Sequence, residues 1–166
     1  MTAPRPNALS WLALSVAVIA FDQASKALVL ATLEPYVPHE VIPGLFNWTL
    51  AFNPGVAFSF LADQPGWQRW PLVLLALGMS LLLTRWLAHT RRGDWRTALP
   101  LALVIGGALG NMIDRVHSGV VTDFVPVYWR EWVFPSFNVA DSAITVGAVL
   151  LVAFGVFASS KKATQS

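Results

Sequence analysis

The sequence has no cysteine and few charged residues. Without cysteine, disulfide bonds, thiolate catalysis and cysteine-based metal sites are excluded. Only 12% of the 166 residues are charged and 55% are hydrophobic, whereas about a quarter of the residues in a soluble domain are charged. The net charge of +2 forms no basic stripe, so nucleic acid is not an expected partner. These shortages favour a protein whose surroundings are lipid.

Tyrosine is also scarce, with 2 residues, but tryptophan is abundant, with 8. Aromatic rings of this kind favour the interface between a bilayer and water. The tryptophans near the ends of apolar segments are Trp67, Trp70, Trp86, Trp95, Trp129 and Trp132. Their placement supports membrane-spanning segments between them.

Four apolar segments are long enough to cross a hydrocarbon core of about 30 Å. They cover residues 8–33, 70–88, 97–113 and 137–159. The first is not read as a cleaved signal, because its apolar character continues well beyond Ser15-Val16-Ala17, which resembles a cleavage site. No internal repeat or low-complexity linker divides the chain. We therefore predict an all-α membrane protein with four transmembrane helices and one domain, residues 1–166.

Two segments between these spans are too polar, or too rich in proline and glycine, to cross a membrane. In the first, Leu45–Phe52 is aromatic and β-branched and precedes the turn signal Asn53-Pro54-Gly55. Val56–Leu61 then fits either a strand or a short helix. In the second, Val120–Tyr128 has the composition of a strand. We predict a small extracytoplasmic β-sheet lying on the membrane surface.

Basic residues predict the orientation in the membrane. With four spans, one side of the membrane holds Arg5, Arg85, Arg91, Arg92, Arg96, Lys161 and Lys162. The positive-inside rule makes this side cytoplasmic. Both termini are then in the cytoplasm and both long loops are outside.

Three acids, Asp114, Asp123 and Asp141, lie on or beside the outer edges of the predicted spans. Carboxylates are costly there, which indicates a function. Two carboxylates about 3 Å apart share a proton, so that one acts as acid and the other as base, and such a pair can activate water against an amide. Asp123 and Asp141 can form the pair if the loop folds back, although Asp114 could replace one partner. Alternatively, Asp123 is an exposed loop acid and Asp141 is favoured by the helix dipole.

Other polar residues near these edges could either stabilise the fold or take part in the function. Asp22 and Lys26 are four apart on one helical face, which favours a supporting ion pair. Asp114-Arg115 follows the third span, with Asn111 one turn earlier. An ion pair anchoring the helix end is the structural reading, and an arginine that holds a lipid phosphate or orients an acid is the functional one.

Two asparagines and the histidines complete the candidates. Asn53 and Asn138 could orient a peptide carbonyl or a carboxylate, or simply cap a turn or a helix. The histidines His39, His89 and His117 lack metal-ligand spacing. A metal site built from His117, Asp114 and Asp123 is a weaker alternative, and no metal or other cofactor is predicted. In the third span, Gly106 and Gly110 share a face that another helix can approach closely.

Together these motifs resemble the bacterial lipoprotein signal peptidase family, also called signal peptidase II. The matching segments cover nearly the whole chain and are Asp22-Gln-Ala-Ser-Lys26, Asn53-Pro-Gly-Val-Ala-Phe58, Gly106-Gly-Ala-Leu-Gly-Asn-Met-Ile-Asp-Arg115, Val121-Thr-Asp-Phe124 and Phe137-Asn-Val-Ala-Asp-Ser142. Several ordered motifs at matching spacings are more specific than any one of them.

The resemblance implies an aspartic endopeptidase of the bacterial inner membrane with its active site on the periplasmic side. It implies cleavage of prolipoproteins just before a diacylglyceryl-modified cysteine. We expect lipidated prolipoprotein and membrane lipid as partners, and a monomer. It assigns catalysis to Asp123 and Asp141. The remaining matched polar positions become substrate-binding or support residues, namely Asp22, Lys26, Asn53, Asn111, Asp114, Arg115 and Asn138.

The alternative function is a small proton-coupled membrane transporter, which would also keep acids within the membrane. Such a protein usually places them near the bilayer midplane and shows repeat symmetry. The sequence shows neither feature, so we favour the peptidase.

Overall fold

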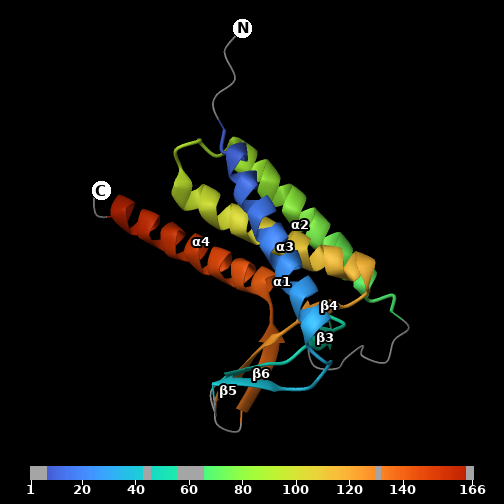
Figure 1. The fold of residues 1–166 in the computed structure, drawn as a ribbon. Helices are drawn as coiled ribbons and strands as arrows, with labels where there is room; N and C mark the ends of the chain where they lie inside the picture. The colour runs from blue at the N-terminus through green and yellow to red at the C-terminus, as the bar shows by residue number, and fades with distance from the viewer. Residues whose placement is uncertain (1–6, 43–45, 56–65, 130–131, 164–166) are drawn as a thin grey trace.

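The computed structural model describes residues 7–42, 46–55, 66–129 and 132–163 (Figure 1). Its helices are η1 (Leu9–Trp11), α1 (Leu12–Thr32), α2 (Arg69–His89), α3 (Trp95–His117) and α4 (Val139–Ala163). Its strands are β1 (His39–Ile42), β2 (Phe46–Trp48), β3 (Ala51–Asn53), β4 (Val121–Asp123), β5 (Val125–Trp129) and β6 (Trp132–Phe137). The fold is thus mostly helical, with small strands, as predicted.

Three helical segments are long and apolar enough to cross a membrane: Leu9–Thr32, Arg69–His89 and Trp95–His117. In α4 the described apolar part, Val139–Gly155, is shorter. The most apolar stretch of α3 is 56% buried, against 22% for that of α1 and 17% for that of α2. Because α3 packs against each of the other three helices, it forms the centre of the bundle.

The helices bury polar side chains and expose apolar ones. Phe21 is 67% exposed, whereas its neighbour Asp22 is fully buried. Large apolar side chains such as Leu74 and Val149 also point away from the bundle. In water this arrangement would be unfavourable. It suits helices that face lipid with one side and each other with the other.

Glycines let α3 approach its neighbours closely. A Cβ atom built on Gly106 would lie 2.9 Å from the carbonyl oxygen of Ser15 in α1. One built on Gly110 would lie 2.8 Å from Oδ2 of Asp22. Both predicted small residues therefore face a neighbouring helix. Sequence reasoning missed Gly107, which faces α4 and whose added Cβ would collide with the carbonyl oxygen of Ala140.

The described strands form three two-stranded antiparallel ladders at one end of the bundle (Figure 1). The ladders are β1–β2, β3–β4 and β5–β6. The single sheet that we predicted is therefore divided. The strand expected over Leu45–Phe52 is interrupted because Thr49 N–H donates to the carbonyl oxygen of Phe124, 3.3 Å away, and Leu50 is buried between Val29 and Phe124. Val56–Leu61 lies outside the described residues.

The other end of the bundle is closed by the beginning of the described chain. Ala8 N–H donates to the carbonyl oxygen of Thr90, 3.1 Å away, and Asn7 pairs with Arg91 in an isolated bridge. A buried apolar cluster beneath includes Leu87 and Leu101. The arginine-containing loop between α2 and α3 and the strands thus lie at opposite ends of the molecule (Figure 1).

Candidate active site

Asp123 is held at the end of β4 by strand pairing. In the β3–β4 ladder, Asp123 pairs with Ala51 and Val121 pairs with Asn53. Asn53 is therefore the diagonal neighbour of Asp123 on the same face, within reach of its side chain. Its Nδ2 donates to Oδ2 of Asp123 at 3.0 Å. The carboxylate is only 2% exposed, so this amide replaces contacts that water would otherwise make.

Asp141 is placed by the start of α4. Asn138 is the residue before this helix, and its Oδ1 accepts a hydrogen bond from Asp141 N–H at 2.9 Å. In return, Asp141 Oδ2 accepts from Asn138 N–H at 3.2 Å. This reciprocal pattern is a capping box, which fixes both side chains at the helix N-terminus. The helix-cap reading of Asn138 is therefore confirmed.

Asn138 also links the two acids. Its Nδ2 donates to Oδ1 of Asp123 at 2.8 Å, while its backbone N–H and Oδ1 hold Asp141. Burial raises the pKa of Asp123 to about 6; the Asn53 hydrogen bond lowers it, and the charge of Asp141 raises it. A carboxyl group with a pKa in this range can hold or release a proton near neutral pH. Asp123 and Asp141, the two acids to which the resemblance assigns catalysis, are therefore linked through Asn138 and interact electrostatically.

Asn111 and Arg115 approach the acids from α3. Asn111 Nδ2 donates to Oδ1 of Asp141 at 2.7 Å. Arg115 Nη1 lies 3.4 Å from the carbonyl oxygen of Asn111, and its charge interacts with both Asp141 and Asp123. Gly55 lies against Arg115: a Cβ there would be 3.3 Å from Nη2, and its φ of +87° favours glycine. The Asn53-Pro54-Gly55 turn therefore sits beside the guanidinium group.

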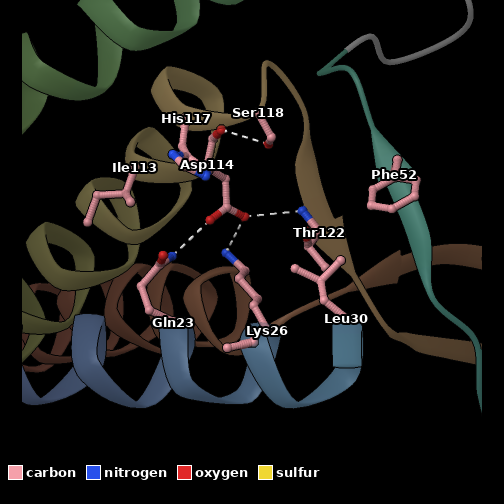
Figure 2. A pocket seen from close by; sticks show the side chains of 10 residues that line it. Gln23, Lys26, Leu30, Phe52, Ile113, Asp114, His117, Ser118 and Thr122 are labelled. Atoms are coloured by element: carbon pink, nitrogen blue, oxygen red, sulfur yellow. Dashed lines mark hydrogen bonds and ion pairs between the residues drawn. The ribbon is translucent and has the colours of Figure 1, made fainter. Parts of the chain in front are cut away.

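A buried ionic cluster joins Lys26 to two carboxylates, and Figure 2 shows its Lys26–Asp114 part. Lys26 Nζ is 2.7 Å from Asp22 Oδ2 and 2.8 Å from Asp114 Oδ2. The predicted Asp22–Lys26 contact is confirmed. The predicted pairing of Asp114 with Arg115 is wrong, because consecutive helical residues point in different directions and Asp114 pairs with Lys26. Both residues lie in the last turn of α3, which ends at His117, rather than beyond it.

Gln23 and Thr122 belong to this cluster and were missed as site residues. Gln23 Nε2 donates to Asp114 Oδ1 at 2.8 Å, and Thr122 N–H donates to Asp114 Oδ2 at 3.1 Å (Figure 2). Both line a pocket of about 360 Å³ between α1, α3 and the β3–β4 ladder. The available signal for Gln23 was its place beside Asp22 in an otherwise apolar run.

The weaker alternative of a metal site gains no support. Asp114 already accepts hydrogen bonds from Lys26, Gln23 and Thr122. Across residues 7–42, 46–55, 66–129 and 132–163, no group of three or more His, Asp or Glu side chains is placed to hold a metal ion. His117 lies at the pocket lined by Gln23 and Thr122 instead.

The candidate site thus joins elements that are far apart in the sequence. Its members come from α1, β3, α3, β4 and the start of α4. The nine residues predicted as catalytic or supporting all lie in this one network: Asp22, Lys26, Asn53, Asn111, Asp114, Arg115, Asp123, Asn138 and Asp141.

Comparisons with known proteins show what this chain is similar to. The model of the family described as signal peptidase (SPase) II matches residues 14–157. A lipoprotein signal peptidase of Xanthomonas campestris pv. campestris (strain 8004) is 55% identical over 154 residues, covering 93% of this chain and 92% of that protein. One of Xylella fastidiosa (strain M12) is 54% identical over 160 residues, covering 96% of each.

Solved structures show the same fold. A structure described as a bacterial membrane enzyme at 2.3 Å resolution superposes with a TM-score of 0.81 and 27% identity, covering 98% of this chain and 96% of that one. A second, at 1.9 Å resolution, gives a TM-score of 0.74 with 28% identity and covers 92% of this chain and 96% of that one. With most of its length matched by the family model and by close relatives, this chain belongs to the signal peptidase II family of bacterial membrane peptidases.

Proposed function

We propose that this protein is an intramembrane aspartic endopeptidase that removes signal peptides from diacylglyceryl-modified prolipoproteins, cleaving before the lipidated cysteine. The observation that carries the proposal is the linkage of Asp123 and Asp141 through Asn138. The raised pKa of Asp123 supports it, because a pair that shares a proton needs one member that is neutral at working pH.

The reaction follows from the two protonation states of the pair. The ionised carboxylate takes a proton from a water molecule as that water attacks the scissile carbonyl carbon. The protonated carboxyl donates a hydrogen bond to the carbonyl oxygen, and a proton is then delivered to the leaving amine. Amides from Asn53, Asn111 and Asn138 keep the two carboxylates aimed during these steps. The mechanism uses no metal and no other cofactor.

The depth of the site suits a lipidated substrate. Asp141 is in the first turn of α4, where apolar helix meets the strands (Figure 1). In the proposed topology this is the periplasmic boundary of the inner membrane, where a signal helix ends. The two acyl chains of the substrate can remain in the bilayer while the peptide reaches the acids. Four transmembrane helices in one domain, acting as a monomer, complete the proposal.

The strands beside the acids are proposed to form a platform for the substrate. Phe52 pairs with Thr122 in the β3–β4 ladder, next to Asp123. Beside this ladder, Trp48 of β2 packs on Phe124, the buried residue that follows β4, with ring centroids 5.7 Å apart. This platform lies on the outer leaflet, where aromatic rings are favoured.

Purified protein in detergent, incubated with lipidated and unlipidated forms of one prolipoprotein, tests the function. We expect cleavage of the lipidated form before its modified cysteine, and little or none of the unlipidated form, by mass spectrometry of the products. A chelator should leave the rate unchanged. Equal cleavage of both forms, or activity that a chelator removes and a divalent metal restores, would contradict the proposal.

The orientation has a separate test. The loop that holds Arg91 and Arg92 lies at the end of the bundle opposite the acids, so we expect both termini in the cytoplasm. A reporter that is active only in the cytoplasm should be active when it is fused after Ser166. Activity of a reporter that works only in the periplasm, fused at the same position, would reverse the topology.

A further inference from the structure

All three proton donors of Lys26 have acceptors inside the protein. The ammonium group has three N–H bonds, and Nζ lies 2.7 Å from Asp22, 2.8 Å from Asp114 and 3.1 Å from Oδ1 of Asn111. The side chain is 3% exposed. Each of the three acceptor groups in turn contacts the segment that carries a member of the acid pair.

The first acceptor, Asp22, reaches the residue before Asp141. Its Oδ2 binds Lys26, and its Oδ1 accepts from Ala140 N–H at 2.9 Å. Asp22 therefore fixes the backbone of the first turn of α4 to α1. The close approach of Gly110, one of whose neighbours is Asp22, leaves this carboxylate little room to move.

The second acceptor, Asp114, reaches the residue before Asp123. Its Oδ2 binds Lys26 and also accepts from Thr122 N–H at 3.1 Å (Figure 2). Asp114 therefore fixes the backbone of β4 to α3. The two buried carboxylates play the same part, each for one member of the pair.

The third acceptor, Asn111, reaches an acid directly. Asn111 Oδ1 accepts hydrogen bonds from Lys26 Nζ and Asn138 Nδ2. The Nδ2 of Asn111 must therefore point the other way, and it donates to Oδ1 of Asp141 at 2.7 Å. A cation beside one end of an amide thus decides which end faces the carboxylate.

We propose that Lys26 is the positioning residue of the acid pair, a single cation whose three hydrogen bonds set the separation and orientation of Asp123 and Asp141 through Asp22, Asp114 and Asn111. This inference rests on the proposed function, because it assumes that those two acids perform the reaction. Lys26 itself touches neither acid and need not touch substrate.

Lys26→Met tests the inference by removing the three donors from a side chain of similar length. We expect kcat per folded molecule to fall about 10²-fold, as for a displacement near 1 Å of reacting groups, while KM for a lipidated prolipoprotein changes little. Folded enzyme is counted by size-exclusion chromatography and thermal unfolding in detergent. A kcat per folded molecule equal to that of the wild type, with only lower stability, would reduce Lys26 to a structural role and overturn the proposal.

The pH profile gives a readout that loss of stability alone would not move. The groups that face Asp123 are Asn53 from β3, Asn138 before α4, Asp141 from α4, Lys26 from α1 and Arg115 from α3. Lys26 is a cation that lowers the pKa of Asp123. The limb of the pH–rate curve that reports Asp123 should therefore move to higher pH in Lys26→Met. An unmoved limb would count against the proposal.

Ser15→Ala is the matched control. Ser15 Oγ donates to the carbonyl oxygen of Ala102 at 2.7 Å, so it also joins α1 to α3 in a buried place, but it has no contact with the acid pair. This variant should lose stability and keep kcat per folded molecule and the pH profile. A loss of kcat like that of Lys26→Met would show that any α1–α3 contact suffices, and would overturn the specific role.

A milder variant covers the case in which Lys26→Met does not fold. Asp22→Asn keeps an oxygen for Ala140 N–H but removes the charge that pairs with Lys26. It should reduce kcat per folded molecule by less than Lys26→Met, and unchanged kcat would refute the arm through Asp22. Failure of the proposed function looks different, because Asp123→Asn or Asp141→Asn would then retain activity whatever Lys26 does.

Discussion

Asp123→Asn and Asp141→Asn should each abolish cleavage of a lipidated prolipoprotein. Asparagine keeps the shape of aspartate but cannot exchange the proton that the pair needs. General acid–base catalysis contributes about 10²–10⁴-fold to a rate, and loss of the activated water adds to this. We therefore expect turnover at or below about 10⁻⁴ of wild type, measured as product formed per folded molecule in detergent.

The same variants should remain folded and inserted in the membrane. Asp123 accepts hydrogen bonds from Asn53 and Asn138, and Asp141 accepts from Asn111 and from the backbone of Asn138. An amide retains one acceptor oxygen, so each variant loses about one hydrogen bond, worth roughly 1 kcal/mol. Near-normal turnover by either variant would exclude the two-acid mechanism.

Asp123→Asn should also change how stability depends on pH. The folded protein raises the pKa of Asp123 from 3.8 to about 6. Between these values the folded state binds a proton that the unfolded chain has released, so the contribution is present at lower pH and is lost as pH rises through 6. Relative to Asp123→Asn, the wild type should lose about 3 kcal/mol of unfolding free energy over this range. If the stability of the wild type and that of Asp123→Asn, measured by thermal unfolding, depended on pH in the same way, the raised pKa would be contradicted.

Gly107→Ala should cause the next largest loss. A Cβ at this position would collide with the carbonyl oxygen of Ala140 and come within 2.8 Å of Ile144 Cγ1. Ala140 precedes Asp141, so α4 can accommodate the methyl group only by moving its first turn. Overpacking of this kind costs about 1–3 kcal/mol, and a shift near 1 Å costs about 10²-fold in rate. Thermal unfolding and kcat in detergent measure the two effects.

Gly78→Ala is the control for that substitution. Gly78 is in α2, and nothing lies within 4 Å of a Cβ built there. Alanine has the better helix propensity by about 1 kcal/mol, so this variant should be as stable as the wild type or slightly more stable, and fully active. If Gly107→Ala behaves like Gly78→Ala, the contact between α3 and α4 does not position Asp141.

The helices could be predicted from the sequence because hydropathy is a local property. The end of α3 was the main error, since Asp114 and Arg115 were read as lying beyond the span. The helix continues through them because Asp114 is paired with Lys26 inside the protein and does not require water. A polar residue ends an apolar run in a sequence without necessarily ending the helix.

The strand pairing could not be predicted in the same way. Asn53 and Asp123 are 70 positions apart, and no local pattern states that β3 and β4 are neighbours. Composition alone also left open which two of three acids form the pair, and only the resemblance selected Asp123 and Asp141. Gln23 was overlooked because an uncharged amide in an apolar helix gives a weak signal. Gly107 was overlooked because the spacing of small residues described only the face shared by Gly106 and Gly110.

The hydrogen bond between Asp22 and Ala140 spans 118 positions of the chain. Domains form their contacts as the chain emerges, and contacts between distant segments close last. Asp22 in α1 can therefore accept this hydrogen bond only after α4 has been synthesised. Because Ala140 precedes Asp141, we expect the contact that fixes Asp141 to α1 to form only after α4 has been synthesised. If the proposed function holds, a chain that lacks α4 should therefore have no activity.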